Sequence, residues 1–297
     1  MFNQTQFTMK NKFKITGAFL IGMMIMMSSI FTSCKDKNNP DDGKIDPGTI
    51  ATSNLVAYFP FDGNATESIA TITPTVQTGV TYVNGQRGQA YQGADLARLL
   101  YQLPAASKMK TLTSFTVALW FKSPLVTGDP EPIFFQVGKS DDLYWGNLTL
   151  ALNRLDATAD TLQFKAFFLK TGVQWSGQHV SYSDKAFVIN TWMHMVFEYD
   201  AMTSKYKIFK NGIQVVTNEG VENRKSGEAG DPLGTLAFAN ADVINIGAWR
   251  PKSEGTAEDA WMGWFKGNLD ELRVYDKALS TTEVEALFEA EVTQLDK

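Results

Sequence analysis

The segment that most constrains the fold is Thr191–Thr217, because three consecutive runs within it have the pattern of antiparallel strands. In the second run charged and apolar residues alternate, which places Tyr206 and Ile208 on one face of a half-buried strand. Asn211 and Gly212 then form the two-residue signal of a type I′ hairpin. A meander of this kind in mid-chain predicts an all-β sandwich. Its runs are Trp192–Tyr199, Lys205–Lys210 and Ile213–Val216.

The rest of the chain supports the same fold class, because short apolar runs separated by turn residues continue on both sides of the meander. One helix is predicted from Thr281 to about Glu291; Ser280 and Glu283 form its capping box, and we expect it to cover an edge of the sandwich. The further predicted strands are Leu55–Phe61, Gly79–Val83, Gln89–Tyr91, Ala97–Leu103, Phe115–Lys122, Pro132–Val137, Asn147–Asn153, Leu162–Leu169, Gln178–Tyr182, Val243–Ile246 and Phe265–Tyr275.

Several segments resemble one known family in the order in which that family uses them. The meander, with its tryptophan, its histidine and its Asn-Gly turn, resembles laminin-G-like, concanavalin A-like domains. LVAYFPFDGNATES (Leu55–Ser68) is similar to the family's opening, and INIGAW (Ile244–Trp249) with FKGNLDELRVYDKALSTTEVEALF (Phe265–Phe288) is similar to its close. The resemblance covers roughly Leu55–Phe288 and implies a jelly-roll β-sandwich of two antiparallel sheets with one short C-terminal helix.

The N-terminus has the pattern of a secretory signal. Three lysines precede an apolar run of about 17 residues, Ile15–Phe31, which is short for a membrane-spanning helix. The run leads to Cys34, the only cysteine of the chain, and this resembles a bacterial lipoprotein signal in which Cys34 receives the lipid. The alternative is an incidental cysteine on a transmembrane anchor. We therefore expect a signal peptide at residues 1–33.

Residues 34–50 are polar, carry both charge signs and include proline and glycine, so we expect a flexible tether before a single domain at residues 51–297. Asp36, close to the lipidated cysteine, resembles the surface-export signals of Bacteroidetes lipoproteins, which implies display on the outer membrane. Attachment to the membrane would then be through the lipid anchor only. The net charge of -5, without a basic stripe, excludes nucleic acid as a partner.

No carboxylate arrangement in the sequence predicts catalysis. Glycoside hydrolases of similar fold carry both catalytic carboxylates on one strand, as in E-x-D-x-x-E, about 5 Å apart in retaining enzymes. Glu198 and Asp200 share a face, but no third carboxylate follows them. His179 and His194 lack a neighbouring nucleophile, and His194, inside an apolar strand, is expected in the core. The remaining acidic groups are Asp141-Asp142, Glu254…Glu258-Asp259 and Asp270-Glu271.

The resemblance implies a structural calcium, because many such domains hold one with carboxylates after the first strand and inside the last. Asp62 and Asp270 occupy those places here. The alternative is that Asp62 caps a turn and Asp270 bonds to backbone. Strand alternation places Glu271 on the face opposite Asp270, so we do not expect these two to bind a cation together.

Seven tryptophans divide into two groups. Trp120, Trp192 and Trp264 lie in or beside strands and are expected in the core, whereas the others lie in polar or glycine-rich loops, where binding sites are common. In a meander successive loops fall at alternate ends, which predicts a main site of Tyr144, Trp145 and Trp175 with Asp141, Asp142 and Gln174. The other end would hold Trp249 and Trp261 as a separate pair. Each loop tryptophan could instead close its own end of the sandwich.

These features favour a surface-anchored, non-catalytic lectin-like protein whose partner is a polysaccharide or glycoconjugate. Two alternatives remain: a protein-binding adhesion module on the same fold, and a glycoside hydrolase with atypical carboxylates. Fold alone does not choose among them.

Overall fold

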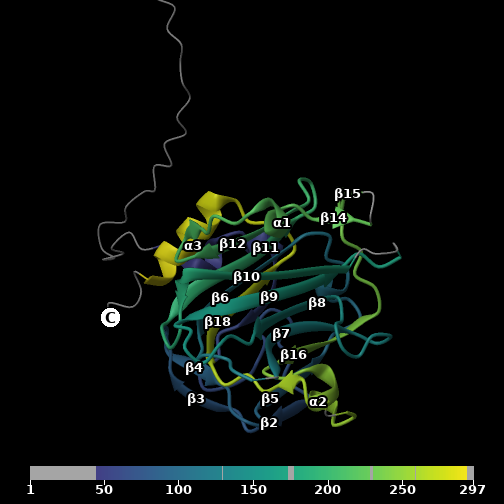
Figure 1. Cartoon of the computed structure of the whole chain (residues 1–297). Helices are drawn as coiled ribbons and strands as arrows, with labels where there is room; N and C mark the ends of the chain where they lie inside the picture. The colour runs from purple at the N-terminus through teal and green to yellow at the C-terminus, as the bar shows by residue number, and fades with distance from the viewer. Residues whose placement is uncertain (1–44, 129, 173–176, 228–229, 258, 293–297) are drawn as a thin grey trace, which may run out of the picture. The chain divides into compact units, whose positions relative to one another are not determined.

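Two antiparallel sheets stack face to face in the computed structural model, which describes residues 45–128, 130–172, 177–227, 230–257 and 259–292 (Figure 1). The predicted signal peptide and most of the tether lie outside these residues. The first sheet has the order β13 (Ile213–Gln214), β12 (Lys205–Lys210), β11 (Met193–Asp200), β6 (Phe115–Lys122), β18 (Asn268–Tyr275), β4 (Gln89–Gln92) and β3 (Thr81–Asn84), with β1 (Leu55–Phe59) also paired to β18.

The second sheet has the order β10 (Gly177–Val188), β9 (Thr161–Leu169), β8 (Leu148–Asn153), β7 (Glu131–Lys139), β16 (Ala241–Ile246), β5 (Arg98–Gln102) and β2 (Val76–Thr78). A short strand, β17 (Met262–Gly263), pairs with β7 in parallel. The predicted jelly-roll β-sandwich is therefore confirmed. Smaller elements are η1 (Pro47–Thr49), η2 (Thr52–Asn54), η3 (Lys108–Lys110), α1 (Glu219–Glu222), β14 (Lys225–Ser226), β15 (Asp231–Pro232), α2 (Arg250–Glu254) and α3 (Thr281–Val292).

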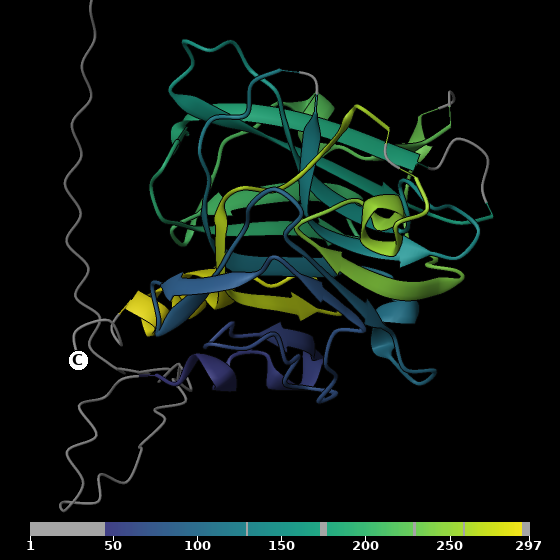
Figure 2. The same ribbon diagram turned by 90° about the horizontal axis from the view of Figure 1, so that it is seen from below.

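Phenylalanine rings from both sheets meet in the space between them. Phe134 of β7 lies 4.9 Å from Phe121 of β6 and 5.9 Å from Phe197 of β11, measured between ring centres. Phe164 of β9 lies 5.1 Å from Phe197. All four are at most 2% exposed, and their ring separations are those of favourable aromatic pairs. This core ties the two layers seen in Figure 2 together.

The central meander forms as predicted. Tyr206 and Ile208 of β12 are each 1% exposed and belong to the core between the sheets. Asn211 and Gly212 both have positive φ, at 50° and 79°, as a type I′ turn requires. The hairpin signal in the sequence was therefore sufficient to fix the register of β12 against β13.

Helix α3 contacts the edge strand β13, as predicted, and also extends over the outer face of the first sheet. Its capping box forms as expected, with Ser280 N donating to Glu283 Oε2 at 2.8 Å. Val284 and Leu287 pack against Ala118 and Val196 of the central strands β6 and β11. Ala118 and Val196 give the helix an apolar surface, and Trp120 and His194 on the same face contact Glu291 of α3.

The last residues of the predicted tether belong to the folded domain instead. Pro47–Thr49 form η1, with Asp46 as the N-cap residue, and Ile50 packs against the cluster beneath α3. The polar composition of residues 34–50 hid this, because the apolar contacts come from Ile50 and from residues after it.

Candidate functional site

Four aromatic side chains from two distant loops gather over the outer face of the second sheet. Trp145 lies 5.3 Å from Trp249 and 6.2 Å from Trp261 between ring centres, and the planes of Trp145 and Trp261 differ by only 19°. Tyr144 lies 6.0 Å from Trp261. The group rests on outward residues of the sheet, Ile133 and Ala151. We call it the aromatic patch: Tyr144, Trp145, Trp249 and Trp261.

The loop that carries Tyr144 and Trp145 is held against the sheet by buried polar side chains. Gln136 Nε2 donates to Tyr144 O at 2.6 Å, and Thr149 Oγ1 donates to Trp145 O at 2.5 Å. Asn245 Nδ2 in turn donates to Gln136 Oε1 at 3.1 Å. These three residues lie on adjacent strands, β16, β7 and β8, and are at most 1% exposed. Buried polar groups need partners, and the loop backbone supplies them for Gln136 and Thr149.

A shallow hollow of about 660 Å³ lies beside the aromatic patch. Lys165 Nζ is 2.7 Å from Glu131 Oε2 and 4.9 Å from the centre of the Trp145 ring, so it makes an ion pair and a cation–π contact together. Trp145 and Trp261 are both partly exposed here. The hollow, which we call hollow A, is lined by Glu131, Trp145, Arg154, Lys165, Asp259, Ala260 and Trp261.

Two aromatic residues that contact Trp145, the buried Phe167 and the exposed His179, were not predicted as part of the site. Trp145 lies 5.4 Å from Phe167 of β9 and 4.9 Å from His179 of β10, between ring centres. Burial, followed by the charge of Lys165, lowers the pKa of His179, so the ring is a neutral support. Strand alternation could have predicted the position of Phe167. Lys165 and Phe167 are an odd number of residues from the core residue Phe164, so their side chains point to the outer face of the sheet.

The predicted separation of the tryptophans into two ends was wrong. The loop that carries Trp145 does leave the sheet at the expected end, beside Ala239 and Asn240, since Ser140 N donates to Asn240 O at 2.9 Å. The loop then folds back over the sheet face, and Trp145 reaches Trp249 and Trp261. The assumption that loops extend outward from the strands failed, because Gln136 and Thr149 hold this loop against the sheet.

Trp249 was also predicted to contact ligand, and its burial contradicts this. It is 0% exposed, and its indole Nε1 donates to Glu131 O at 2.6 Å. Its packing fixes the position of Trp145 and Trp261 instead. The expectation that Trp192 and Trp264 lie in the core was wrong as well, since both are partly exposed, whereas Trp120 is buried.

The predicted polar partners of the site organise the loop and do not line hollow A. Asp142 Oδ1 accepts from the backbone N–H of Tyr144 and Trp145, at 3.0 and 3.1 Å. Asp141 pairs with Lys139 at 2.9 Å on the surface. Gln174 and Trp175 lie outside the described residues.

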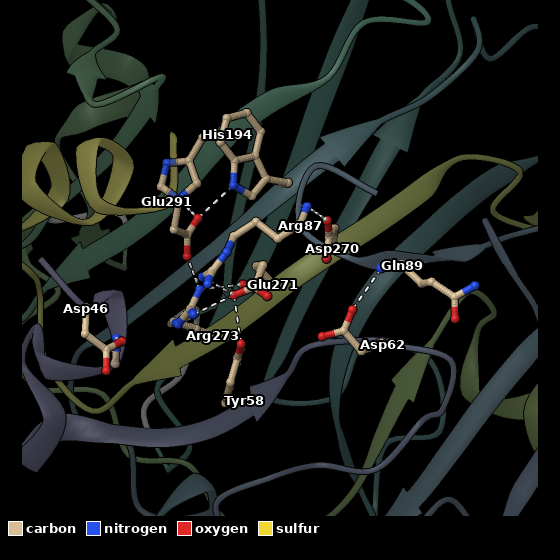
Figure 3. A network of polar contacts seen from close by, with 12 residues as sticks. Asp46, Tyr58, Asp62, Arg87, Gln89, His194, Asp270, Glu271, Arg273 and Glu291 are labelled. Atoms are coloured by element: carbon tan, nitrogen blue, oxygen red, sulfur yellow. Dashed lines mark hydrogen bonds and ion pairs between the residues drawn. The ribbon is translucent and has the colours of Figure 1, made fainter. Parts of the chain in front are cut away.

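Two other carboxylates face one turn, Gly85–Gly88, between β3 and β4 (Figure 3). Asp270 Oδ2 accepts from Arg87 N at 2.8 Å, and Asp62 Oδ1 accepts from Gln89 N at 2.8 Å. A Cβ atom added at Gly85 would clash with the Asp270 carboxylate, and a Cβ atom added at Gly88 would clash with the Asp62 carboxylate. Both carboxylates therefore lie directly against the backbone of the turn. Asp270 is fully buried, and its Oδ1 has no hydrogen-bond partner among the described residues.

Glu271 lies on the same side as Asp270, which corrects the prediction that it faces the other way. A bulge between Asp270 and Arg273, with Glu271 at φ 53°, interrupts the alternation of β18. Glu271 Oε2 accepts from Arg273 at 2.6 Å, from Tyr58 at 2.8 Å and from Arg87 at 3.1 Å (Figure 3). These bonds occupy its carboxylate, whereas the hydrogen bonds that Asp270 and Asp62 accept at the turn come from the backbone N–H groups of Arg87 and Gln89.

Two of the groups considered for catalysis, Glu198 and His194, are enclosed. Glu198 is 1% exposed with Lys207 Nζ 3.3 Å from its Oε1, and burial raises its pKa to about 7. His194 is buried beneath α3, as predicted, and burial lowers its pKa to about 3. Its Nε2 lies 3.6 Å from Glu291, which also bonds Trp120 and Arg273 (Figure 3). This network anchors the helix to the sheet.

Among the residues that the structure describes, no three His, Cys, Asp or Glu side chains form a group that could hold a metal ion. Within the same ranges, no helix combines the length and the apolar character needed to cross a membrane.

Asp270 makes stability depend on pH. Burial raises the pKa of Asp270 from 3.8 to about 8, and the nearby charges of Glu271 and Asp62 also raise it. The backbone hydrogen bonds from Arg87 and Gln86 act in the opposite direction and lower the pKa. The unfolded chain therefore releases this proton near pH 3.8 and the folded chain near pH 8. We expect the free energy of unfolding to fall by several kcal/mol across that range, at about 1.4 kcal/mol per pKa unit, and Asp270→Asn to remove most of the fall. Urea unfolding with chelator across that range measures it; parallel profiles for the two proteins would contradict the expectation.

The comparisons with known proteins agree with this architecture. A family model described as the concanavalin A-like lectin/glucanases superfamily, laminin-G type, matches residues 100–285. Comparison with curated protein sequences finds no significant match.

Solved structures of similar fold include toxin binding domains. The binding domain of botulinum neurotoxin DC, in complex with rat synaptotagmin II, has a TM-score of 0.56 at 13% identity, covering 82% of this chain and 52% of that one. Botulinum neurotoxin type C, whose cell entry is described as dependent on two ganglioside molecules, has a TM-score of 0.56 at 13% identity, with 83% and 52% covered. The binding domain of Paraclostridial Mosquitocidal Protein 1 has a TM-score of 0.53 at 17% identity, with 80% and 52% covered.

The chain spans about half the length of these structures, so the likeness concerns one sandwich. The family match covers more than half of the present chain and includes the central meander and the last strand. This protein belongs to the laminin-G-type family of the concanavalin A-like lectin/glucanase superfamily.

Proposed function

We propose that this protein binds carbohydrate at hollow A, beside the aromatic patch, and does so without catalysis. The observation that carries the proposal is the pair of nearly parallel, partly exposed indoles of Trp145 and Trp261 on a rigid support. The C–H faces of a sugar ring pack on such aromatic surfaces, and its hydroxyls need polar groups close by. Glu131, Lys165 and Asp259 supply these groups around the same hollow.

Preorganisation favours this site for binding. The ring of Trp145 is fixed by Phe167, His179 and Trp249, and its backbone oxygen by Thr149. A ligand that packs on this surface therefore orders few side chains, which reduces the entropic cost of association. A small open site of this kind gives weak binding, about -4 to -8 kcal/mol, and many copies on one surface would strengthen attachment.

The structural neighbours supply both a supporting case and a rival. One toxin domain is described with gangliosides, which carry sugars, and another with a protein, synaptotagmin II. A protein-binding adhesion module on the same sandwich is thus the second candidate. Carbohydrate binding and protein binding differ in the residues that they require. Carbohydrate binding at hollow A needs Trp145 and Trp261, whereas a protein interface could use another part of the surface.

The test of carbohydrate binding is Trp261→Ala, with Trp192→Ala as the matched control. Trp192 is also a partly exposed tryptophan, but it does not line hollow A. Loss of the exposed indole should weaken binding about tenfold or more, since central aromatic contacts dominate such sites. Affinity electrophoresis against a panel of polysaccharides, followed by calorimetry, measures it. Equal binding by both variants, or binding of proteins but no glycan by the unaltered chain, would contradict the proposal.

We also propose that Asp62 and Asp270 hold a structural calcium ion at the turn Gly85–Gly88. The lone Oδ1 of Asp270 and the two carboxylates beside one turn fit a hard cation. Calcium takes about six to eight oxygen ligands, so backbone carbonyls would have to complete the set. When bound, the ion would neutralise the two carboxylates and join β18 to the segment after β1.

Calcium should raise the melting temperature of the unaltered protein by several degrees relative to chelator, because binding to the folded state stabilises it. Asp270→Asn should lose this response while remaining folded, and magnesium should replace calcium poorly. Thermal melts of both proteins with calcium, with magnesium and with chelator measure it. An unchanged melting temperature in the unaltered protein on adding calcium would remove the site.

We further propose that Cys34 carries a lipid that anchors the protein to the outer membrane with the domain facing outward. The basic and apolar N-terminal pattern and the polar tether support this. Cys34→Ser should abolish labelling with a fatty acid and move the protein out of the membrane fraction. Protease added to intact cells should digest the unaltered protein; retention of Cys34→Ser in washed membranes would contradict the anchor.

A further inference from the structure

Hollow A is one of three hollows that adjoin one another at one end of the sandwich. Ala260 lines hollow A and also a second hollow of about 400 Å³, hollow B. Arg154 lines hollow A and also a third of about 540 Å³, hollow C. Thr127 lines both B and C. Each hollow shares a lining residue with both others, so the three lie next to one another, and we call them together the depression.

The walls of this depression are held by backbone hydrogen bonds between its loops. Leu155 N donates to Val126 O at 2.9 Å, which joins the β8–β9 loop to the β6–β7 loop. Glu131 N donates to Trp261 O at 2.7 Å and fixes the segment between hollows A and B. A Cβ at Gly263 would lie 2.8 Å from Pro132 N, so only glycine lets this segment approach β7 so closely. The relative positions of the hollows are therefore set by the fold.

Hollow B offers surface to the C–H groups of a sugar. Its lining is apolar on one side, with a polar rim where Lys266 Nζ lies 2.8 Å from Asp95 Oδ1. Lys252 Nζ lies 4.6 Å from the centre of the Trp264 ring, which holds this partly exposed indole in place. The apolar residues that line hollow B include Pro124, Leu125, Val126, Pro132, Met262 and Trp264.

The charges around the depression nearly balance, with four acidic lining residues against three basic ones, because Arg154 lines both hollow A and hollow C. In hollow A the acidic Glu131 and Asp259 face the basic Lys165 and Arg154. In hollow B Asp95 is paired with Lys266, and in hollow C Asp156 accompanies Arg154. The whole chain has a net charge of -5, which opposes the approach of a polyanion. Neither the site nor the surrounding protein therefore selects an acidic polymer.

Building on the proposed function of hollow A, we infer that the ligand is an internal stretch of a neutral linear polysaccharide that occupies hollows A and B together. Each hollow alone has the volume of a small-molecule site, about 300–1000 Å³, so one terminal sugar would fill only part of the depression. Trp261 serves the first part of the chain and Trp264 the second. Affinity then increases with ligand length, because each added sugar unit makes further contacts.

The experiment measures the affinity of the full chain for ladders of cello-, xylo-, manno- and arabino-oligosaccharides, from the disaccharide to the octasaccharide, by calorimetry. Oligogalacturonides of equal length serve as the acidic comparison. We expect an affinity for one neutral ladder that rises at least about tenfold with length and then levels off. We also expect little dependence on salt, since no net charge is neutralised on binding.

Variants separate this inference from the proposed function. Trp264→Ala should weaken only the long oligosaccharides, about tenfold, whereas Trp261→Ala should weaken short and long ones alike. Thr127→Arg, at an exposed loop position between hollows B and C, should give the same length-specific loss if Trp264→Ala fails to fold. Trp192→Ala, which lines none of the three hollows, should change neither.

Equal affinity for the disaccharide and the octasaccharide would overturn the extended site while leaving carbohydrate binding at hollow A intact. Preference for oligogalacturonides would overturn the neutral class. A length-dependent affinity that both Trp264→Ala and Thr127→Arg leave unchanged would overturn the assignment to hollow B. Absence of binding to every ladder and to the polysaccharide panel would overturn both proposals together.

Discussion

Burial of phenylalanine rings between the two sheets is the interaction on which the rest of the molecule depends. Phe121 and Phe197 from one sheet meet Phe134 and Phe164 from the other, all nearly or fully enclosed. Because side chains alternate along a strand, inward phenylalanines determine which residues must face outward. The outward set of β9 includes Phe167, which supports the ring of Trp145. The packing between the sheets thus decides which side chains support the candidate site on the outer face.

The two outer faces of the sandwich are covered in different ways, and this difference explains where a ligand can bind. On the first sheet α3 covers Val196 and His194, and its own Glu291 is buried against the sheet. On the second sheet loops cover Ile133 and Ala151 but leave Trp145 and Trp261 partly exposed beside a hollow. The helix covers the residues beneath it without a gap, whereas the loops leave gaps over theirs. A gap lined by aromatic and charged groups can bind a ligand.

Bulges place key side chains at both sites. The register of β7 shifts between Ile133 and Phe135, so Phe134 and Phe135 both join the core while Ile133 lies under the aromatic patch. In β18 the bulge at Glu271 brings this side chain to the side of Asp270, where it pairs with Arg273. An extra residue in one strand changes the parity of everything after it, which is how neighbouring residues acquire different roles.

The sequence by itself determined the sandwich, the hairpin at Asn211-Gly212, the capping of α3 and the placement of Tyr144, Trp145 and Trp261 in loops, because alternation, turn chemistry and loop composition are local signals. Only the tertiary structure decided that Trp145 folds back onto Trp261, that Trp249 is buried, and that Glu271 shares a side with Asp270. The physical reason is that these outcomes depend on contacts distant in the chain. The bond from Gln136 to Tyr144 O and the ring of Phe167 direct the loop, and no local pattern records where a loop will rest on a sheet.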